Sequence, residues 1–274
     1  MDKFGGNGPL TAGEKKARQR DFLHDGRLEM VVNLLTSVPQ VEFFVKTRES
    51  NYVAVSPGLQ LRLGCLNSAD VFGKNDYDFV LPSVADEYLK DDQRVVRENV
   101  VMKDQFELFS PLASSARLVQ TTKFPVADRQ GDVIGLVGVI RQFQGSETSL
   151  PMKFRGTLDS LSFQIVAIVQ ENLSKRLTVR DLSKRIGVSE GKITKVVNSL
   201  FEMSVAKFVE RVRFQSIARE LLLSNDQIGN IAERFGFQSA SAFCVRFGKA
   251  TGVTPMELRK NWEERRHQVA GVQN

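Results

Sequence analysis

The C-terminal third of the chain repeats one local pattern: a short helix, a turn containing glycine, and a second helix that begins at a serine. The predicted segments are a helix over 179–186, Gly187 and a helix from Ser189, then a helix over 228–235, Gly236 and a helix from Ser239. A serine hydroxyl accepts hydrogen bonds from free N–H groups at a helix start, and glycine adopts the left-handed conformation that ends a helix. The sequence therefore predicts two helix-turn-helix units.

A single long helix is predicted between the two units, over 204–224, with its apolar residues on one face. Another helix, over 158–173, precedes the first unit. Twenty-one residues at a rise of ~1.5 Å each span roughly 31 Å, close to the ~34 Å between successive major-groove faces of B-DNA. The spacing favours two recognition helices that enter adjacent grooves, and an all-helical protein-binding module is the alternative.

The charge of the chain is concentrated in the same part. Residues 175–267 contain eighteen Lys and Arg against ten Asp and Glu, a balance of +8, whereas the whole chain carries +6. A basic segment beside a nearly neutral remainder is typical of a domain that faces a polyanion. A solubilising surface is the alternative explanation of the charge alone.

The N-terminal half has a different sequence pattern, in which short runs typical of β-strands alternate with helical ones. Strands are predicted over 42–46, 52–55, 105–110, 117–126 and 133–143, and helical segments over 57–63 and 82–101. The turn at 128–132 between the last two strands is rich in Asp and Gly, which favours a hairpin. This order predicts an α+β domain with one antiparallel sheet and helices over one face. The whole chain is thus α+β followed by all-α.

Residues 39–143 resemble a PAS domain. The resemblance is carried by Val41-Glu42-Phe43-Phe44-Val45-Lys46, by the run from Gly73 to Phe79, and by Phe124-Pro125-Val126-Ala127-Asp128 with Gly131 and Gly135. It implies a sensory or dimerising module with a small cavity between sheet and helices. The stretch lacks histidine and the Asn-Cys-Arg-Phe motif of flavin photosensors, so we predict no cofactor.

A pocket in this domain would be lined by apolar residues and a few polar groups. The candidate lining residues are Tyr52, Phe72, Tyr77, Phe79, Phe106, Leu118, Gln120, Thr121 and Ile134. Ordinary core packing is the alternative for each of the apolar residues. Two interpretations of the domain stay open: it binds a small molecule, or it is a ligand-free dimerisation module. A homodimer is expected in either case.

The C-terminal domain, over 157–267, resembles the DNA-binding domain of AraC-family transcription regulators. The resemblance is carried by Ile231-Ala232-Glu233-Arg234-Phe235-Gly236-Phe237, Ser241-Ala242-Phe243, Arg246-Phe247 and Gly252-Val253-Thr254-Pro255. It implies that the second helix of each unit binds double-stranded DNA. Among the positions that depart from the family pattern, Glu202 replaces the usual glycine after the first recognition helix, and Val245 occupies a common arginine position.

The resemblance assigns DNA-contacting residues to both units. Those predicted in the first unit are Gly191, Lys192, Thr194, Lys195 and Asn198, and those in the second are Ser239, Ala240, Ser241, Val245, Arg246 and Lys249. We assign most base reading to Lys195 and Thr194. Ala240 and Val245 cannot form hydrogen bonds with base edges but can contact a thymine methyl group. The remaining polar residues are expected to hold phosphates.

The rest of the chain was assigned by composition. We predict a flexible basic arm over 1–21, a helix over 22–38, a linker over 144–156 and a tail over 268–274. The first twenty residues lack the apolar core of a secretory signal, and no run reaches a membrane span, so the cytoplasm is expected. With two histidines and two distant cysteines, we predict no catalytic residues and no metal site, and an enzyme with a helical appendage is the rival interpretation.

Overall fold

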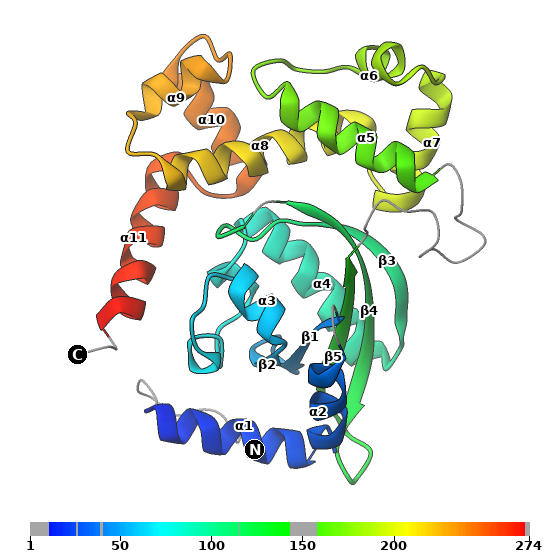
Figure 1. Ribbon diagram of the computed structural model, residues 1–274, viewed down its shortest axis with the longest axis vertical. Helices are drawn as coiled ribbons and strands as arrows, with labels where there is room; N and C mark the ends of the chain where they lie inside the picture. Colours follow the sequence, from blue (N-terminus) through cyan, green and yellow to red (C-terminus); the bar gives the residue numbers. More distant parts are fainter. Residues whose placement is uncertain (1–10, 26, 39–40, 115, 143–157, 272–274) are drawn as a thin grey trace. The chain divides into compact units, whose positions relative to one another are not determined.

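The computed structural model describes residues 11–25, 27–38, 41–114, 116–142 and 158–271. The chain divides into two compact units, one built mainly from the N-terminal sheet and its helices and the other mainly from the C-terminal helices (Figure 1). The first unit is α+β and the second contains the helical region, which agrees with the fold class predicted from the sequence.

A five-stranded antiparallel sheet lies at the centre of the N-terminal unit (Figure 1). Its strands are β1 (Val41–Thr47), β2 (Tyr52–Val55), β3 (Met102–Phe109), β4 (Arg117–Ala127) and β5 (Val133–Gln142). They lie in the order β2-β1-β5-β4-β3, so the first strand pairs with the last. Phe44 is opposite Gly138 in that pairing, and a side chain on Gly138 would overlap the Phe44 ring. The five strands expected from the sequence are all present.

Helices α3 (Pro57–Arg62) and α4 (Pro82–Glu98) lie on the inner side of the curved sheet (Figure 1). Two short 3-10 turns, Ser68–Asp70 and Asp76–Asp78, connect them. The Ser56 hydroxyl accepts a hydrogen bond from the Leu59 N–H at 3.3 Å and so caps α3. α4 buries Val84, Tyr88, Val95 and Val96 along one face, which is the stripe that predicted a helix there.

Two expectations for the N-terminus were wrong. Helix α1 (Ala12–Asp25) occupies much of the segment expected to be a flexible arm, and α2 (Glu29–Ser37) is separate from it, so 22–38 is not one helix. Thr11 and Glu14 form a capping box at the start of α1. Phe22 is 3% exposed and packs in a cluster with Val45 and Val53 of the sheet.

Hydrogen bonds from side chains to backbone carbonyls explain why α1 forms, and a turn explains why it is separate from α2. The Lys15 ammonium donates to the Ala69 carbonyl at 3.1 Å, and the Gln19 amide donates to the Val53 carbonyl at 2.8 Å. Arg27, between α1 and α2, has φ of 55°, the left-handed conformation that breaks a continuous helix. Polar side chains therefore fix α1, which lacks the apolar stripe that marks a helix in the sequence. Residues 1–10 of the expected arm lie outside the described residues.

The C-terminal region consists of seven helices among the described residues. They are α5 (Leu158–Glu171), α6 (Val179–Ile186), α7 (Glu190–Phe201), α8 (Val205–Leu223), α9 (Ile228–Arg234), α10 (Ala240–Thr251) and α11 (Pro255–Gly271). The predicted helix-turn-helix units are α6–α7 and α9–α10, and α8 is the predicted connecting helix. α11 continues to Gly271, so the expectation that a tail begins at residue 268 was wrong. The predicted linker, 144–156, falls outside the described residues.

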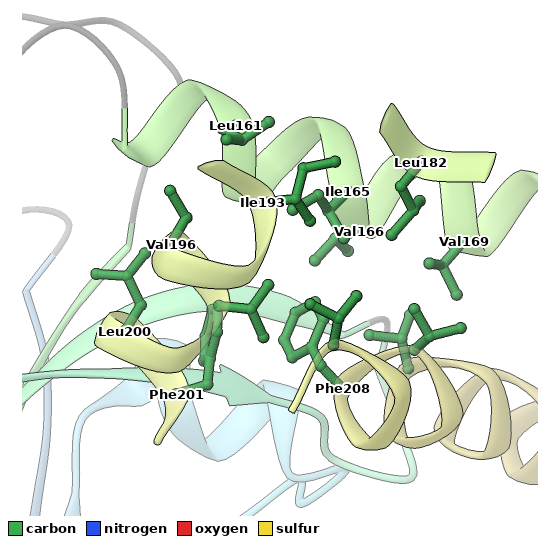
Figure 2. Packing of buried hydrophobic residues seen from close by; sticks show 14 of the residues in the cluster. Leu161, Ile165, Val166, Val169, Leu182, Ile193, Val196, Leu200, Phe201 and Phe208 are labelled. Carbon is green, nitrogen blue, oxygen red and sulfur yellow. The ribbon is translucent and has the colours of Figure 1, made fainter. Parts of the chain in front are cut away.

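The first helix-turn-helix unit has its own apolar core with α5 and the start of α8 (Figure 2). The residues of this core include Leu161, Ile165, Val166, Val169, Leu182, Ile193, Val196, Leu200, Phe201 and Phe208. Phe201 and Phe208 stack with ring centroids 4.4 Å apart. This packing leaves the opposite face of α7 to solvent. A second cluster of Phe214, Phe237, Phe243 and Phe247 joins α8 to the second unit.

The described part of the chain contains neither a membrane-spanning helix nor a cluster of metal-binding side chains. Its helices are too short or too polar to pass through a lipid bilayer. Its His, Cys, Asp and Glu side chains do not gather in groups of three or more that could hold a metal ion.

Candidate nucleic-acid interface

The first helix-turn-helix unit is shaped by three local signals. The Thr178 hydroxyl accepts from the Asp181 N–H at 3.2 Å and the Asp181 carboxylate accepts from Thr178, so α6 begins with a capping box. Gly187 has φ of 78° and ends α6. The Ser189 hydroxyl then accepts from the Lys192 N–H at 3.3 Å and starts α7. The turn between the two helices is therefore only three residues long, from Gly187 to Ser189.

Helix α7 presents the five residues that the sequence predicted as DNA contacts. Gly191, Lys192, Thr194, Lys195 and Asn198 are all exposed. The intervening Ile193, Val196, Val197 and Leu200 are buried in the core of Figure 2. The structure thus brings the predicted residues together on one solvent-facing side of one helix. Their role as DNA contacts stays a prediction.

Further cations lie on α6, and the sequence reading did not single them out. Arg180, Lys184 and Arg185 are exposed. Within the described part of the chain, none of these three, nor Lys192 or Lys195, forms an ion pair. The spacing of four between Arg180 and Lys184 was the signal that could have found them. The first unit therefore offers five unneutralised positive charges to a polyanion.

The second unit has the same construction. Gly236 follows α9 with φ of 73°, and the Ser239 hydroxyl accepts from the Ala242 N–H at 3.1 Å to start α10. The structure places Ser239, Ala240, Ser241, Val245 and Lys249 on the exposed side of this helix. Val245 is 68% exposed. The Ser239 hydroxyl oxygen accepts the capping hydrogen bond and its O–H stays available to donate to a phosphate, so the phosphate contact expected of it stays a prediction.

Arg246, expected to hold a phosphate, is directed toward α8 instead of outward. Its guanidinium pairs with the Glu210 carboxylate at 2.9 Å, and its carbon Cζ lies 6.0 Å from the centre of the Phe237 ring. The side chain is 40% exposed. An exposed ion pair of this kind is worth little energy and can open, so the phosphate role stays a prediction that requires this pair to break.

The buried Arg213 holds the two helix-turn-helix units in place. The Arg213 Nε donates to the Leu173 carbonyl at 2.7 Å, and its second amino group donates to the Phe235 carbonyl at 2.5 Å. The guanidinium also lies 4.6 Å from the centre of the Phe237 ring. Burial, with the nearby charge of Arg246, lowers the pKa of Arg213. Arg213 thus ties the end of α5 to the end of α9, and through them positions both recognition helices.

The structure shows the local setting of Glu202 and Val245, the two departures from the family pattern named above. Glu202 ends α7 in the left-handed conformation, with φ of 51°, whereas Gly252 ends α10 with φ of 81°. A side chain in this conformation costs roughly 1–2 kcal/mol. The first unit therefore carries local strain at the position where the second has glycine. Val245, the other departure, is the most exposed large apolar residue of α10.

The candidate pocket residues of the N-terminal domain are divided among different packed clusters and the surface. Phe72 and Ile134 pack in the cluster that contains Phe22, and Phe106 and Leu118 belong to a different cluster. Tyr77 is 38% exposed and donates to Asp86, so its assignment as a lining residue was wrong. It lies on a surface turn, and its ring has no place in the interior.

The remaining four candidates are buried. Tyr52 and Phe79 make an edge-to-face contact with ring centroids 5.7 Å apart. Gln120 and Thr121 are 3% and 2% exposed. The Gln120 amide nitrogen and the Thr121 hydroxyl have no hydrogen-bond partner. Buried polar groups without partners cost about 1–3 kcal/mol each, which makes these two side chains candidates for contact with a ligand.

The structure reveals a buried charge cluster in the same interior that the sequence reading missed. The Lys46 ammonium lies 2.5 Å from an Asp76 oxygen and 2.8 Å from an Asp92 oxygen. The Lys123 ammonium lies 2.7 Å from the other Asp92 oxygen. The Tyr52 hydroxyl donates to Asp76 at 2.7 Å. The four charged side chains are at most 5% exposed and their charges cancel.

The cluster shifts the pKa values of its members. Burial alone would raise the pKa of Asp92, but the charges of Lys123 and Lys46 outweigh burial and hold that pKa below its usual value. Burial would likewise lower the pKa of Lys46, yet the charges of Asp76 and Asp92 raise it. Burial, with the charge of Asp76, raises the pKa of Tyr52 well above its usual value. Lys46 and Asp92 are therefore both ionised at neutral pH.

Comparison with protein families divides the chain as the structure does. Residues 182–261 match a family of helix-turn-helix domains, and residues 35–147 match the PAS fold. The helix-turn-helix match covers α7 to α10 and the start of α11, and the PAS match covers the five-stranded sheet.

Curated relatives match a minor part of the chain. One is an uncharacterised HTH-type transcriptional regulator of Bacillus subtilis, YisR, 26% identical over 102 residues, which are 37% of this chain and 36% of the relative. Another is the HTH-type transcriptional activator AarP of Providencia stuartii, 27% identical over 100 residues, 36% of this chain and 74% of the relative. A diguanylate cyclase of Vibrio cholerae is 31% identical over 112 residues, 40% of this chain and 33% of the relative.

Solved structures are more distant. The C-terminal domain of AraT, a response regulator from Geobacillus stearothermophilus, is 24% identical and aligns with 38% of this chain and 88% of its own, with a TM-score of 0.34. The chain spans about a third of the length of two of these curated relatives and about three quarters of the third.

Proposed function

We propose that this chain, which joins a PAS fold to an AraC-type helix-turn-helix domain, is a sequence-specific DNA-binding transcription regulator. The observation that carries the proposal is the exposed face of α7. There two lysines without ion-pair partners, a threonine and an asparagine point away from a continuous apolar core. Such side chains donate hydrogen bonds to base edges and phosphates in a major groove.

The scale of the helical region fits two grooves. α8 contains nineteen residues, which at ~1.5 Å each span about 28 Å, slightly less than one turn of B-DNA. It connects two units with the same capped second helix. From this arrangement we expect a DNA site with two recognised blocks of sequence, both on the same side of the duplex. Because the target is chromosomal DNA, the proposal also places the protein in the cytoplasm.

The N-terminal unit would act as the sensor or the dimerisation module of this regulator. The unpartnered Gln120 amide and Thr121 hydroxyl support a small-molecule ligand that supplies hydrogen bonds. The filled, charge-neutral interior around Asp92 supports a ligand-free module. In both cases we propose a homodimer, in which the sensor would set the placement of two DNA-binding domains. No cofactor is part of the proposal.

An enzyme is the rival class. One relative is a diguanylate cyclase, a name that suits a shared sensory domain as well as an enzyme. Cys65 gives little support to nucleophilic catalysis, because burial raises the pKa of its thiol to about 11. Thermal-shift screening of nucleotides and metabolites, with product analysis, separates the two classes. Turnover of a nucleotide would favour the enzyme.

We expect the protein to bind duplex DNA with an affinity that falls steeply as salt rises. Five unneutralised cations on α6 and α7 predict a slope of log K against log salt of roughly −4 to −5. Fluorescence anisotropy of a labelled random-sequence duplex, titrated at several salt concentrations, measures this slope. No binding at low ionic strength would remove the proposed function.

Lys195→Ala should relax the base preference at one position of the site, at a cost of about 1–3 kcal/mol on the preferred sequence. Arg246→Ala should weaken all sequences about equally, because its expected partner is a phosphate. Selection from a random duplex pool, followed by sequencing, measures both effects. Lys260→Ala, which removes an exposed lysine of α11 paired with Glu264, is the matched control. A changed preference for Arg246→Ala alone would reverse the assignment.

A further inference from the structure

Two arginines of the second helix-turn-helix unit and one of α11 are engaged within the protein, whereas Lys249 of α10 is exposed and forms no ion pair among the described residues. Arg234 pairs with Glu220 at 2.6 Å and also contacts Asp226. The Arg259 guanidinium donates to the Leu221 carbonyl at 2.8 Å and to the Ser224 carbonyl at 3.0 Å. Arg246 pairs with Glu210, as described above. Among the cations of α9 and α10, Lys249 is therefore the one that no carboxylate pairs with, whereas the first unit offers five such cations.

The recognition helices can be compared position by position, because each begins at a serine cap and contains twelve residues. Counted from Ser189 and Ser239, Lys195 and Val245 are each the sixth residue, and Lys192 and Ala242 are each the third. All four are exposed. The second helix thus has methyl groups at the positions where the first helix has ammonium groups.

We infer that α10 selects thymine at its half of the site by contact between the Val245 methyl groups, with those of Ala240 and Ala242, and the 5-methyl group of the base. This inference rests on the proposed function. In the major groove only thymine presents a methyl group, and an apolar side chain gains from contact with it while gaining nothing from a base donor or acceptor. Ser241 supplies the exposed hydroxyl of this surface.

The two units would then divide the work of recognition. α7 reads its block through hydrogen bonds and binds phosphates through the cations of α6 and α7. α10 reads its block through apolar contacts, and its phosphate contacts come from Lys249 and from Arg246 once the pair with Glu210 opens. A site with a mixed block facing α7 and a thymine-rich block facing α10 follows.

Replacement of thymine by deoxyuridine tests this inference, since it removes only the methyl group and preserves base pairing. Random-pool selection with the full chain first gives the two-block site, and Lys195→Ala identifies the block that faces α7. Deoxyuridine is then placed in the other block. Removal of one buried methyl group should weaken binding about fourfold, measured by anisotropy at fixed salt.

Two variants distinguish the outcomes. Val245→Ser should bind thymine and deoxyuridine duplexes equally, whereas Met256→Ser, a change at an equally exposed apolar residue of α11, should keep the fourfold difference. Sequence-specific binding without any thymine preference in the α10 block would overturn the inference and leave the proposed function standing. Absence of DNA binding would overturn both.

Discussion

Replacement of Asp92 by asparagine is expected to destabilise the N-terminal unit by about 3–5 kcal/mol, the usual cost of removing one partner from a buried ion pair. Asp92 is fully buried and accepts from two lysines, one on β1 and one on β4. Asparagine has a similar shape but no charge. The Lys123 ammonium would lose its ion pair with Asp92, and Lys46 would lose one of its two ion pairs and keep that with Asp76.

Asp91→Asn is the matched control, because Asp91 is the neighbour of Asp92 on α4. Burial raises the pKa of Asp91, which means that its neutral form is already favoured relative to an exposed carboxylate. The amide should therefore cost less than 1 kcal/mol there. Urea unfolding of the full chain, followed by a probe in the N-terminal unit, measures both variants. Equal stabilities of the two variants would contradict the assigned role of the cluster.

The pH dependence of the unfolding free energy should also change in the Asp92→Asn variant. Because the folded-state pKa of Asp92 is lowered, its contribution is present above the unfolded-state pKa of ~3.9 and is lost as pH falls through the folded-state value. The pKa of Lys46 is raised, so its contribution is present below ~10.4 and is lost as pH rises through the folded-state value. Asp92→Asn should flatten the acid limb of the unfolding free energy.

The helical region was predictable because its signals are local. Ser189 and Ser239 cap the helices that the sequence assigned to them, and Thr178 and Ser204 cap two more predicted helices, each within three residues of the hydrogen-bond donor. The exposed face of α7 follows from another local signal, the helical spacing of its apolar residues. α1 was missed for the opposite reason, since long-range contacts of Lys15 and Gln19 fix it and no apolar stripe marks it.

The charge cluster could not be predicted from the sequence. Lys46 is separated by 30 residues from Asp76 and by 46 from Asp92, and Lys123 by 31 from Asp92. An isolated lysine in a strand most often lies at the surface, and only the packing of α4 and of the turn Asp76–Asp78 on the sheet places these four charges together. The pairing of Arg246 with Glu210, 36 residues away, was hidden for the same reason.

The same distinction between local and distant contacts separates two glycines at equivalent turns. Gly187 and Gly236 each follow the first helix of a unit, with φ of 78° and 73°. The space where a side chain on Gly187 would lie is open, but a side chain on Gly236 would overlap the carbonyl oxygen of Ser174. The backbone after α5 passes directly against the second turn, next to the Leu173 carbonyl that Arg213 binds.

Gly236→Ala is therefore expected to destabilise the helical region by about 2–5 kcal/mol, and Gly187→Ala by about 1–2 kcal/mol. Both changes place a side chain in the left-handed conformation, which costs about 1–2 kcal/mol, and Gly236→Ala adds a packing clash of about 1–3 kcal/mol. Urea unfolding compares the two. Because the clash pushes α9 from the end of α5, Gly236→Ala should also weaken binding to a two-block DNA site at temperatures where the variant is folded. Equal costs for the two variants would show that the contact with Ser174 does not hold the units together.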